Sequence, residues 1–562
     1  MIDTSYAVQG TTDLSNTVKH VVVEDSINPT SFIDPTARLL VAASEVVEQS
    51  EIPKLPCSIP IDTVIPPRTS RRHAKKASKS TPVILPVVNS GSTIDTFRTA
   101  LKKIDLDECE ANGENAFYVC DLAVVYRLYL RWQKVMGRRV KPFFAVKCNP
   151  DPHVINLFAK LGLGFDCASH AEIAQVLAFG VSPSNIIYAN PCKAGSFIRH
   201  AHASGVEMMT FDNMDELHKV AKHHPSAKMV IRILIDDRGS LCRFGEKFGA
   251  PLENVHLLLG TARQLGVNVI GVAFHVGSGC TNPELYKDAL KHAKWVFELA
   301  SQHGYQFNLL DVGGGFGDDN LEFLAEGLLA GLDEYFPVGC GVNVIAEPGR
   351  YFVTEAFELA TNVIARRQVS NTKVQLDAPM IAPVDSEEEP VTLYYINDGV
   401  YGAFNCIMFD HQVVHPKILT LDGKFYSDGA RPLIETIIDH PHTPALSEDN
   451  MESSVTSLSP LSSVIISPET ESQGVCSFSS LELHACRIFG PSCDSIDLVC
   501  PRTLLPTEVL KVGDWLKWER MGAYTVCAAS QFNGFKISQV QYTIDAKGDE
   551  ELENELRSII RQ

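Results

Sequence analysis

The chain has 562 residues, 45% of them hydrophobic, so it is long and apolar enough to form at least two domains with buried cores. Its formal net charge of −19 argues against polyanionic partners, nucleic acid among them. The N-terminus has no apolar leader, no apolar run is long enough to span a bilayer, and the 15 cysteines lack the paired spacing of zinc ligands. We therefore expect a cytoplasmic protein that binds no nucleic acid, membrane or metal ion.

The N-terminal part of the chain predicts little ordered structure. Residues 1–92 are rich in Ser, Thr, Pro and Val and show no sustained periodicity, which is typical of a mostly disordered tail. A basic cluster within it, Arg68–Lys79, is expected to be a solvated patch. A second segment of this kind, 442–474, is predicted to be a low-complexity insert in an otherwise ordered region.

Eight short β-branched or aromatic runs alternate with helical periodicity between residues 123 and 356. Eight strands with seven intervening helices match the size of a TIM-like (β/α)8 barrel, although the pattern alone leaves a doubly wound open sheet as an alternative. The runs are PFFAV, LGFDCA, NIIYAN, MMTFD, MVIRILI, IGVAFHV, NLLDVG and VNVIAEP.

After about residue 357 the helical period fades and strand-like runs follow. They predict a β-rich C-terminal domain of barrel or sandwich type over residues 357–540, with residues 541–562 as a C-terminal tail. The fold class is therefore α/β, a barrel followed by a β domain. The predicted strands are VTLYYIND, FNCIMFD, ACRIFG, SIDLVC and DWLKWERMGAYTVCA.

Reactive residues and glycines collect at the ends of the predicted barrel strands, where such barrels build their active sites. Taken singly, each has an ordinary structural explanation: a strand-end lysine reaches to water, and a glycine triplet makes a turn. Their convergence on one face of the barrel favours a functional site. The residues are Lys147, Asp166, Ser169, His275, Ser278, Gly313, Gly314, Gly315, Glu347, Pro348, Gly349 and Arg350.

This set of residues is suited to a ligand that carries both a phosphate and an aldehyde. The glycine triplet allows a phosphate to approach the backbone N–H groups, and Arg350 can add a charged donor. Lys147 can form a Schiff base, which makes pyridoxal phosphate the economical candidate. Glu347 could then stabilise a protonated pyridine nitrogen, and His275 could stack on the ring. Without that cofactor, His275 would be explained as a satisfied core histidine.

The motifs in chain order resemble those of the fold-type III pyridoxal-phosphate decarboxylases and, more narrowly, of the eukaryotic ornithine decarboxylases. The resemblance extends from about Phe117 to Phe535, apart from the insert. The motifs are FFAVKCNP, GFDCAS, FHVGSGC, DVGGGF, AEPGRYFV, YYINDGVYGAFNCIMFDH, FGPSCDSID and ERMGAYTVCAASQFNGF.

The resemblance implies decarboxylation of L-ornithine to putrescine and carbon dioxide, the first step of polyamine biosynthesis. It implies that Lys147 holds the cofactor and that Cys493 protonates the substrate's α-carbon. It also implies an obligate homodimer in which each site is completed by Cys493 and Asp494 of the other chain. Residues 93–122 would join the β domain as a lead-in segment.

The resemblance supplies the remaining site residues. Phe409 stands where some relatives have Tyr, so a hydroxyl contact with substrate is not expected there. The further residues implied at the cofactor are Asp166, Glu172, Arg232, His275, Ser278 and Tyr524, and those implied at the substrate are Tyr401, Phe409, Asp410, Asp494 and Phe532.

Other interpretations stay open at this point. A decarboxylase of lysine or of a modified ornithine would also use Asp410 and Asp494 to hold a distal ammonium group. A non-catalytic regulator resembling antizyme inhibitor would not need Lys147 and Cys493. A racemase of similar fold would lack the GPSCD motif. The segment GSFIRHAHASGVEMM matches the region where relatives bind antizyme, which is a further partner that the resemblance suggests.

Overall fold

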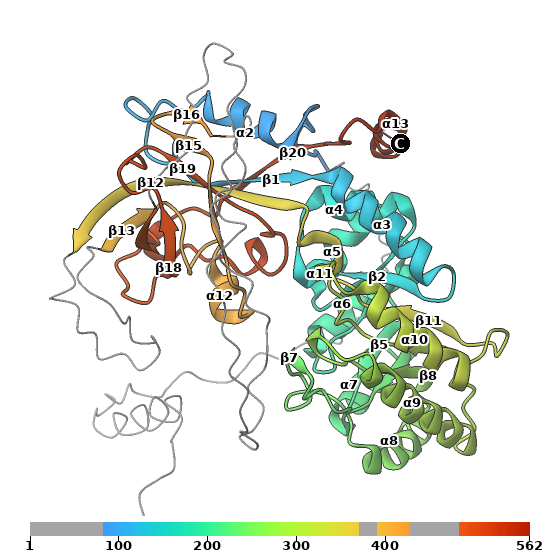
Figure 1. Cartoon of the computed structure of the whole chain (residues 1–562). Helices are drawn as coiled ribbons and strands as arrows, with labels where there is room; N and C mark the ends of the chain where they lie inside the picture. The colour runs from blue at the N-terminus through green and yellow to red at the C-terminus, as the bar shows by residue number, and fades with distance from the viewer. Residues whose placement is uncertain (1–82, 370–390, 427–482, 562) are drawn as a thin grey trace, which may run out of the picture. The chain divides into compact units, whose positions relative to one another are not determined.

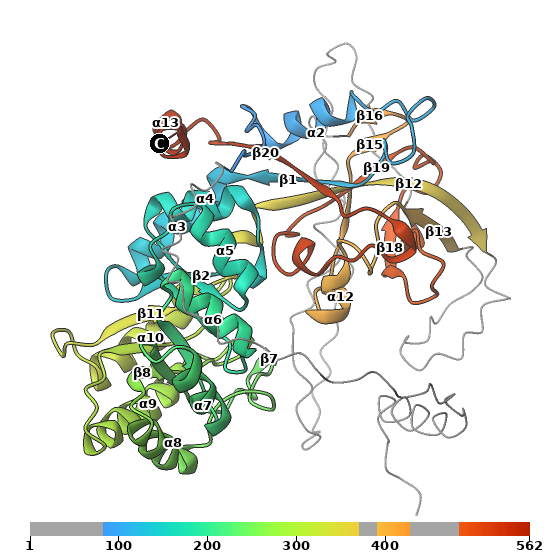
Figure 2. The same ribbon diagram turned by 180° about the vertical axis from the view of Figure 1, so that it is seen from behind.

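The computed structural model describes residues 83–369, 391–426 and 483–561. The predicted insert, 442–474, and most of the predicted tail, 1–92, lie outside these residues. The described chain contains a closed barrel of parallel strands and a sheet-rich part formed mainly by the C-terminal residues (Figure 1, and from behind in Figure 2). Among the described residues, no helix is both long and apolar enough to cross a membrane.

The barrel closes through eight parallel strands, one in each of the eight predicted runs, so the barrel is confirmed and the open sheet is wrong. The chain passes around the barrel in sequence order, as expected for successive βα units. The strands are β2 (Lys141–Ala145), β3 (Gly164–Cys167), β4 (Ile186–Tyr188), β5 (Met208–Phe211), β6 (Lys228–Arg232), β8 (Asn268–Ala273), β10 (Leu309–Asp311) and β11 (Asn343–Ala346).

Helices connect these strands on the outside of the barrel (Figure 1). The first of them begins where Asp151 accepts hydrogen bonds from the N–H groups of His153 and Val154, and it ends at Gly162 with φ +77°. The helices are α4 (Pro152–Leu161), α5 (His170–Ala178), α6 (Gly195–Ser204), α7 (Met214–His223), α8 (Leu252–Gln264), α9 (Glu284–Gln302) and α10 (Leu321–Tyr335), with α3 (Leu122–Met136) before β2 and α11 (Arg350–Val353) after β11.

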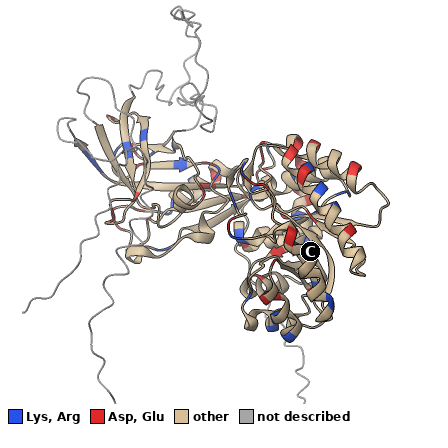
Figure 3. Cartoon of the chain, turned by 90° about the horizontal axis from the view of Figure 1, so that it is seen from below, with Lys and Arg blue, Asp and Glu red and all other residues tan. Residues whose placement is uncertain are grey.

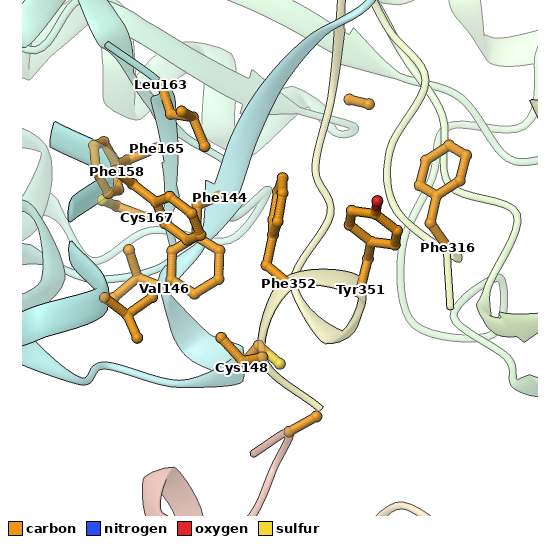
Figure 4. Packing of buried hydrophobic residues seen from close by; sticks show 14 of the residues in the cluster. Phe144, Val146, Cys148, Phe158, Leu163, Phe165, Cys167, Phe316, Tyr351 and Phe352 are labelled. Carbon is orange, nitrogen blue, oxygen red and sulfur yellow. The ribbon is translucent and has the colours of Figure 1, made fainter. Parts of the chain in front are cut away.

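Alternate residues of the barrel strands enter two different cores. Phe144 of β2 packs against Phe158 of α4 with ring centroids 4.9 Å apart, and Phe352 lies 4.9 Å from Phe158 (Figure 4). The neighbouring Phe143 belongs to a smaller cluster that takes one side chain from each of six strands, as expected for the interior of a barrel. Successive side chains of β2 therefore point in opposite directions, one toward the surrounding helices and the next into the barrel interior.

The sheet of the β domain has the strand order β14-β19-β12-β13-β17-β18, and β1 joins it from the N-terminal side of the barrel. β1 pairs antiparallel with β12 and parallel with β20, so chain segments before and after the barrel share one sheet. The strands are β1 (Phe117–Asp121), β12 (Phe357–Val369), β13 (Val391–Ile396), β14 (Pro416–Ile418), β17 (His484–Phe489), β18 (Leu498–Leu505), β19 (Trp515–Trp518) and β20 (Gln539–Thr543).

Two strand predictions in this part are wrong. The run FNCIMFD is a short helix, α12 (Asn405–Phe409), and the side-chain amide of Asn405 donates to the carbonyls of Gly402 and Thr525 at 2.6 Å. A short apolar run does not by itself distinguish a helix from a strand. The run DWLKWERMGAYTVCA is a strand only in β19, because the chain turns at Arg520 with φ +60°.

Two further features concern the ends and the surface of the described chain. Residues assigned to the C-terminal tail include the last part of strand β20, from residue 541 to its end, and a helix, α13 (Glu550–Arg561), which contacts α3 and α4. The boundaries chosen for the domains remain predictions.

Acidic and basic residues are interspersed over the barrel helices, as expected for a solvated surface (Figure 3).

Candidate active site

Lys147 stands at the C-terminal end of the first barrel strand. After β2 the chain makes one 3-10 turn, η1 (Val146–Cys148), which carries this lysine, and its side chain is 41% exposed. Its Nζ donates to the carboxylate of Asp166, whose place is set by the pairing of Asp166 with Ala145 across β2 and β3. The strand register therefore holds an accessible lysine against a fully buried acid.

The charges around Lys147 determine its protonation. Desolvation by the surrounding protein lowers the pKa of Lys147, but the carboxylates of Asp166 and Glu347 more than offset this, so the pKa lies above its usual value. Lys147 is therefore an ammonium group in this structure. It needs to lose a proton before it can attack a carbonyl carbon.

Three buried carboxyl groups meet at this end of the barrel: Asp166, Asp311 at the end of β10, and Glu347 after β11. Each has one oxygen that finds no hydrogen-bond partner among the described residues. Desolvation raises the pKa of Asp311 to about 7 and raises that of Glu347 well above its usual value. Buried acceptors without donors are the signature of a site that a ligand completes with an N–H or a positive charge.

His275 is a neutral imidazole beside these acids. Its Nδ1 accepts a hydrogen bond from the N–H of Gly277 at 2.9 Å, which leaves the proton on Nε2. Desolvation lowers its pKa well below the usual value, and the charges of Arg232 and Lys147 lower it further. Its ring packs edge-on against Phe244 at 4.9 Å. A neutral ring in this position can contact a flat ligand without repelling a cation.

The glycine triplet after β10 is required by its backbone. Gly313 has φ +67° and Gly315 has φ +108°, which side chains rarely adopt. A Cβ at Gly313 would lie 2.4 Å from the carbonyl oxygen of Phe274, and one at Gly314 would lie 2.9 Å from that of Glu347. Only glycine fits here, and the bare backbone leaves room for a phosphate.

Arg350 joins the barrel to the β domain. Its Nη2 donates to Asp410 at 2.6 Å and to the hydroxyl of Ser278 at 3.3 Å, and its guanidinium lies 5.0 Å from the ring centre of Tyr524. The backbone N–H of Tyr524 donates to the carbonyl of Cys148, next to Lys147, at 3.0 Å. One wall beside the lysine is thus formed by Arg350, Ser278 and Tyr524, and it carries hydroxyl groups and a positive charge. The guanidinium of Arg350 is ion-paired with Asp410.

Three other predicted site residues make contacts with the protein that involve none of the residues described so far as ligand-binding. Glu172 lies in the first turn of α5, and its carboxylate accepts from the N–H of Ala168 at 2.6 Å, so it stabilises the start of the helix. Arg232 lies over the ring of Phe248 at 5.2 Å. The carbonyl of Pro348 accepts from the N–H of Ala145 at 3.3 Å.

Gly349 is a close-approach glycine beside the lysine turn. A Cβ at Gly349 would lie 2.7 Å from the Cβ of Cys148. Backbone packing accounts for the glycine at position 349, and the part that Pro348 and Gly349 take in cofactor binding stays a prediction.

A second group of predicted residues lies in the β domain. The hydroxyl of Tyr401 donates to Asp494 at 2.6 Å, and its ring stacks on Phe532 with centroids 4.1 Å apart. The N–H of Cys493 donates to the side chain of Asn533 at 3.2 Å. The hydrogen bond from Tyr401 lowers the pKa of Asp494. Among the described residues, no hydrogen bond or ion pair joins this group to Lys147 or to the three buried acids.

Exposed apolar side chains lie close in sequence to members of this second group. Phe409 is 75% exposed on α12, and Phe532 remains 40% exposed although it stacks on Tyr401. Met408, Val413 and Ile496 are also exposed. Large apolar side chains on a surface commonly mark a contact with another molecule.

The family-level comparison agrees with this geometry. A family model described as the pyridoxal-dependent decarboxylase, pyridoxal binding domain, matches residues 122–354. Ornithine decarboxylase of Neurospora crassa is 46% identical over 446 residues, which cover 78% of this chain and 83% of that protein. The chain belongs to the ornithine decarboxylase family.

Two further similarities show how widely this family's fold is used. Antizyme inhibitor 2 of Xenopus laevis is 42% identical over 452 residues, covering 80% of this chain and 85% of that protein. The solved structure of an arginine decarboxylase from Paramecium bursaria Chlorella virus matches with a TM-score of 0.63 and 29% identity, covering 80% of this chain and all of that one. Family membership alone therefore leaves the substrate to be argued from the site.

This member of the ornithine decarboxylase family is a pyridoxal-phosphate enzyme, and the residues present fit that cofactor. The unpartnered oxygen of Glu347 suits a pyridine N–H, and Lys147 suits the aldehyde carbon. The glycine triplet and Arg350 suit the phosphate. The fit rests on buried acceptors that lack donors and on a loop that a Cβ would fill.

Sequence reasoning missed Asp311, whose Oδ1 accepts from the N–H of Gly313 at 2.9 Å and so shapes the glycine loop. The signal was present, because an acid stands at the end of a strand, two residues before the first glycine of the triplet. It also missed Asn533, which has φ +53° and holds Cys493. The Asn-Gly pair in FNGF is a turn signal that could have found it.

Proposed function

We propose that the protein decarboxylates L-ornithine to putrescine and carbon dioxide, the first step of polyamine biosynthesis. One observation carries the proposal. An accessible lysine, three buried carboxyl groups and the glycine loop lie together at the C-terminal end of the barrel strands. The 46% identity to a curated ornithine decarboxylase supports the choice of substrate. Pyridoxal phosphate, when bound, supplies an aldehyde for the substrate amine and a ring that withdraws electrons from the α-carbon.

The barrel residues would divide the work around the cofactor ring. Lys147 would hold the cofactor's aldehyde carbon, and Asp166 would keep the lysine in position. Glu347 would accept the pyridine N–H, so that its negative charge favours the protonated ring. His275 would pack on the ring face as a neutral imidazole. Arg232 would balance the charge of Asp311 and Glu347 from the β6 side.

The phosphate would occupy the wall formed by the loops after β8, β10 and β11. Gly313, Gly314 and Gly315 leave the backbone open to it. Ser278, Arg350 and Tyr524 bring hydroxyl and guanidinium donors to the same place. Glu172 would act indirectly, by holding the start of α5 next to Asp166.

The substrate's distal ammonium group would be held by carboxylates. Asp410 has one buried oxygen without a donor among the described residues, and Arg350 occupies the other. A phosphate that attracts Arg350 would leave Asp410 free to accept the ammonium. Tyr401, Phe409, Phe532 and Asp494 would line the approach from the β domain.

We propose that each complete site needs two chains. The separation of the Tyr401 group from the barrel acids, and the exposed apolar residues close in sequence to its members, support a homodimer. The partner's Asp494 would help to hold the distal ammonium. The partner's Cys493 would deliver a proton to the substrate's α-carbon after carbon dioxide leaves. All cysteines among the described residues are free thiols, which supports a reducing, cytoplasmic location.

Discrimination between ornithine and lysine rests on a small difference. The two substrates differ by one methylene group, which is worth about 1–3 kcal/mol in a pocket. The second candidate function, a non-catalytic regulator, is favoured by the 42% identity to antizyme inhibitor 2, but Lys147 with its acid partner favours an enzyme. The solvent-facing part of α6 is a proposed antizyme-binding region on the strength of resemblance alone.

The test is carbon dioxide release from L-ornithine, L-lysine and L-arginine by the holoenzyme. We expect strong preference for ornithine and a loss of at least about 10³-fold in Lys147→Ala, because the substitution removes the covalent attachment of the cofactor. The matched control is Lys141→Ala, which removes the lysine at the other end of β2, where Nζ contacts Asn185 at 3.1 Å. Full cofactor content with no release from any substrate would contradict the proposal.

A further inference from the structure

Arg520 adopts a backbone conformation that a long side chain rarely takes. It follows β19 and has φ +60°, in the left-handed region that favours glycine or asparagine. Such conformations persist only where surrounding contacts hold them, and they cluster at functional sites. The contacts made by Arg520 therefore show what the strained turn is for.

The guanidinium of Arg520 makes a two-pronged ion pair with Asp318. Nη1 lies 2.6 Å from Oδ2 and Nη2 lies 2.9 Å from Oδ1, and the Asp318 side chain is only 1% exposed. Asp318 comes three residues after Gly315, at the end of the glycine loop. Arg131 of α3 donates to the backbone carbonyl of Asp318 from another side. The end of the glycine loop is thus fixed at two points.

Residues 520–524, which we call the strap, are fastened to the chain segments that follow β2 and β11. The N–H of Met521 donates to the carbonyl of Phe357 at 2.9 Å, and the carbonyl of Gly522 accepts from the side chain of Asn149 at 2.8 Å. A Cβ at Gly522 would lie 1.7 Å from the carbonyl oxygen of Val353, so the strap touches the barrel backbone directly. The strap ends at Tyr524, which lies against Arg350.

Arg520 also reaches the segment that carries Asp410. The side-chain amide of Gln412 donates to the carbonyl of Arg520 at 2.9 Å. One residue therefore contacts the glycine loop through its side chain and the Asp410 segment through its backbone. A bidentate arginine–carboxylate pair fixes both the distance and the orientation of the elements that it joins.

We infer that the Arg520–Asp318 pair is a positioning contact that sets the spacing between the glycine loop and the Tyr524–Arg350 wall, and so sets the affinity for the cofactor's phosphate. The inference rests on the proposed function of this wall as the phosphate site. Arg520 does not touch the reacting atoms; it acts through Asp318 and Tyr524. A purely structural role would instead make the pair a fastener between sheet and barrel, with no effect on anion binding.

The test uses the full chain without cofactor and inorganic phosphate as the probe. Arg520→Asn removes the ion pair and keeps a residue that tolerates positive φ, and Asp318→Asn removes the pair from the other side with little change in shape. Lys417→Gln is the control, because it breaks a neighbouring ion pair with Glu519 (2.7 Å) outside the strap. Thermal shift with phosphate and spectroscopic titration with pyridoxal phosphate measure the two affinities.

We expect both variants to bind phosphate and pyridoxal phosphate about tenfold more weakly than the control does. Arg520 also contacts Glu355 at 3.3 Å, so the double variant is compared with Arg520→Asn. The double variant should bind no more weakly than Arg520→Asn alone, because that single variant already removes the pair with Asp318. Unchanged affinities with a lower melting temperature would overturn the inference. Decarboxylation by the wild-type holoenzyme tests the proposed function separately, so the two failures are distinguishable.

Discussion

The barrel mouth and the Tyr401 group differ in how completely one chain builds them. Lys147, Asp166 and Glu347 are positioned by paired strands, and two of these three side chains are buried. Tyr401 and Phe532 stack on loops of the β domain, and Phe532 remains 40% exposed. Paired strands and burial position the first group within one chain, whereas exposed apolar side chains in the second group commonly mark a contact with another molecule. This difference is the physical basis of our proposal that two chains share each site.

The largest effect is expected at the barrel mouth, from Glu347→Gln. A neutral amide does not stabilise a protonated pyridine ring, so kcat for ornithine should fall by about 10²–10³-fold at equal cofactor content. Steady-state kinetics with spectroscopic determination of bound cofactor measures this. Glu326→Gln, on the exposed face of α10, is the control and should leave kcat unchanged. An unaltered kcat in Glu347→Gln would remove this residue from the catalytic site.

A second effect at the barrel mouth concerns stability and pH. The pKa of Asp311 is raised from 3.8 to about 7 in the folded protein, so the folded state binds this proton more tightly than the unfolded chain does. Its contribution to stability is full below about pH 4 and is lost as pH rises through 7. At about 1.4 kcal/mol per pKa unit, the loss is on the order of 4 kcal/mol for the apoprotein.

Asp311→Asn is the variant that isolates this effect. Between pH 4 and 7, its apoprotein should lose less unfolding free energy than the wild type does, as measured by urea unfolding at several pH values. Asp333→Asn is the control, because Asp333 is exposed on α10 and, among the residues that the structure describes, its ion pair is a long one with Arg139 at 3.9 Å. Identical pH slopes for wild type and Asp311→Asn would show that Asp311 is already ionised in the folded protein.

The smallest effect is expected in the β-domain group, from Tyr401→Phe. Loss of the hydroxyl that donates to Asp494 should raise KM for ornithine a few-fold, or about 0.5–1.5 kcal/mol, and should leave cofactor affinity unchanged. Tyr395→Phe is the matched control, since Tyr395 stacks on Phe489 elsewhere in the sheet. A change in cofactor affinity without a change in KM would assign Tyr401 to the other half of the site.

Sequence pattern predicted the features that depend on neighbours along the chain. Each barrel strand combines an apolar run with a glycine or cap nearby, and Lys147 follows directly from the end of β2. The helix α12 was missed, because its start depends on the contact of Asn405 with Thr525 far along the chain. The pairing of Arg350 with Asp410 joins residues 60 positions apart, and no local signal encodes it.

The direct test of shared sites is subunit complementation. Lys147→Ala and Cys493→Ala are each expected to be inactive, and co-expression of the two should restore about one quarter of wild-type activity. Half of the random dimers are mixed, and each mixed dimer contains one complete site out of two. Lys147→Ala co-expressed with the double variant Lys147→Ala/Cys493→Ala is the control and should stay inactive. No recovery in the first mixture, with mixed dimers confirmed by mass, would contradict a site shared between chains.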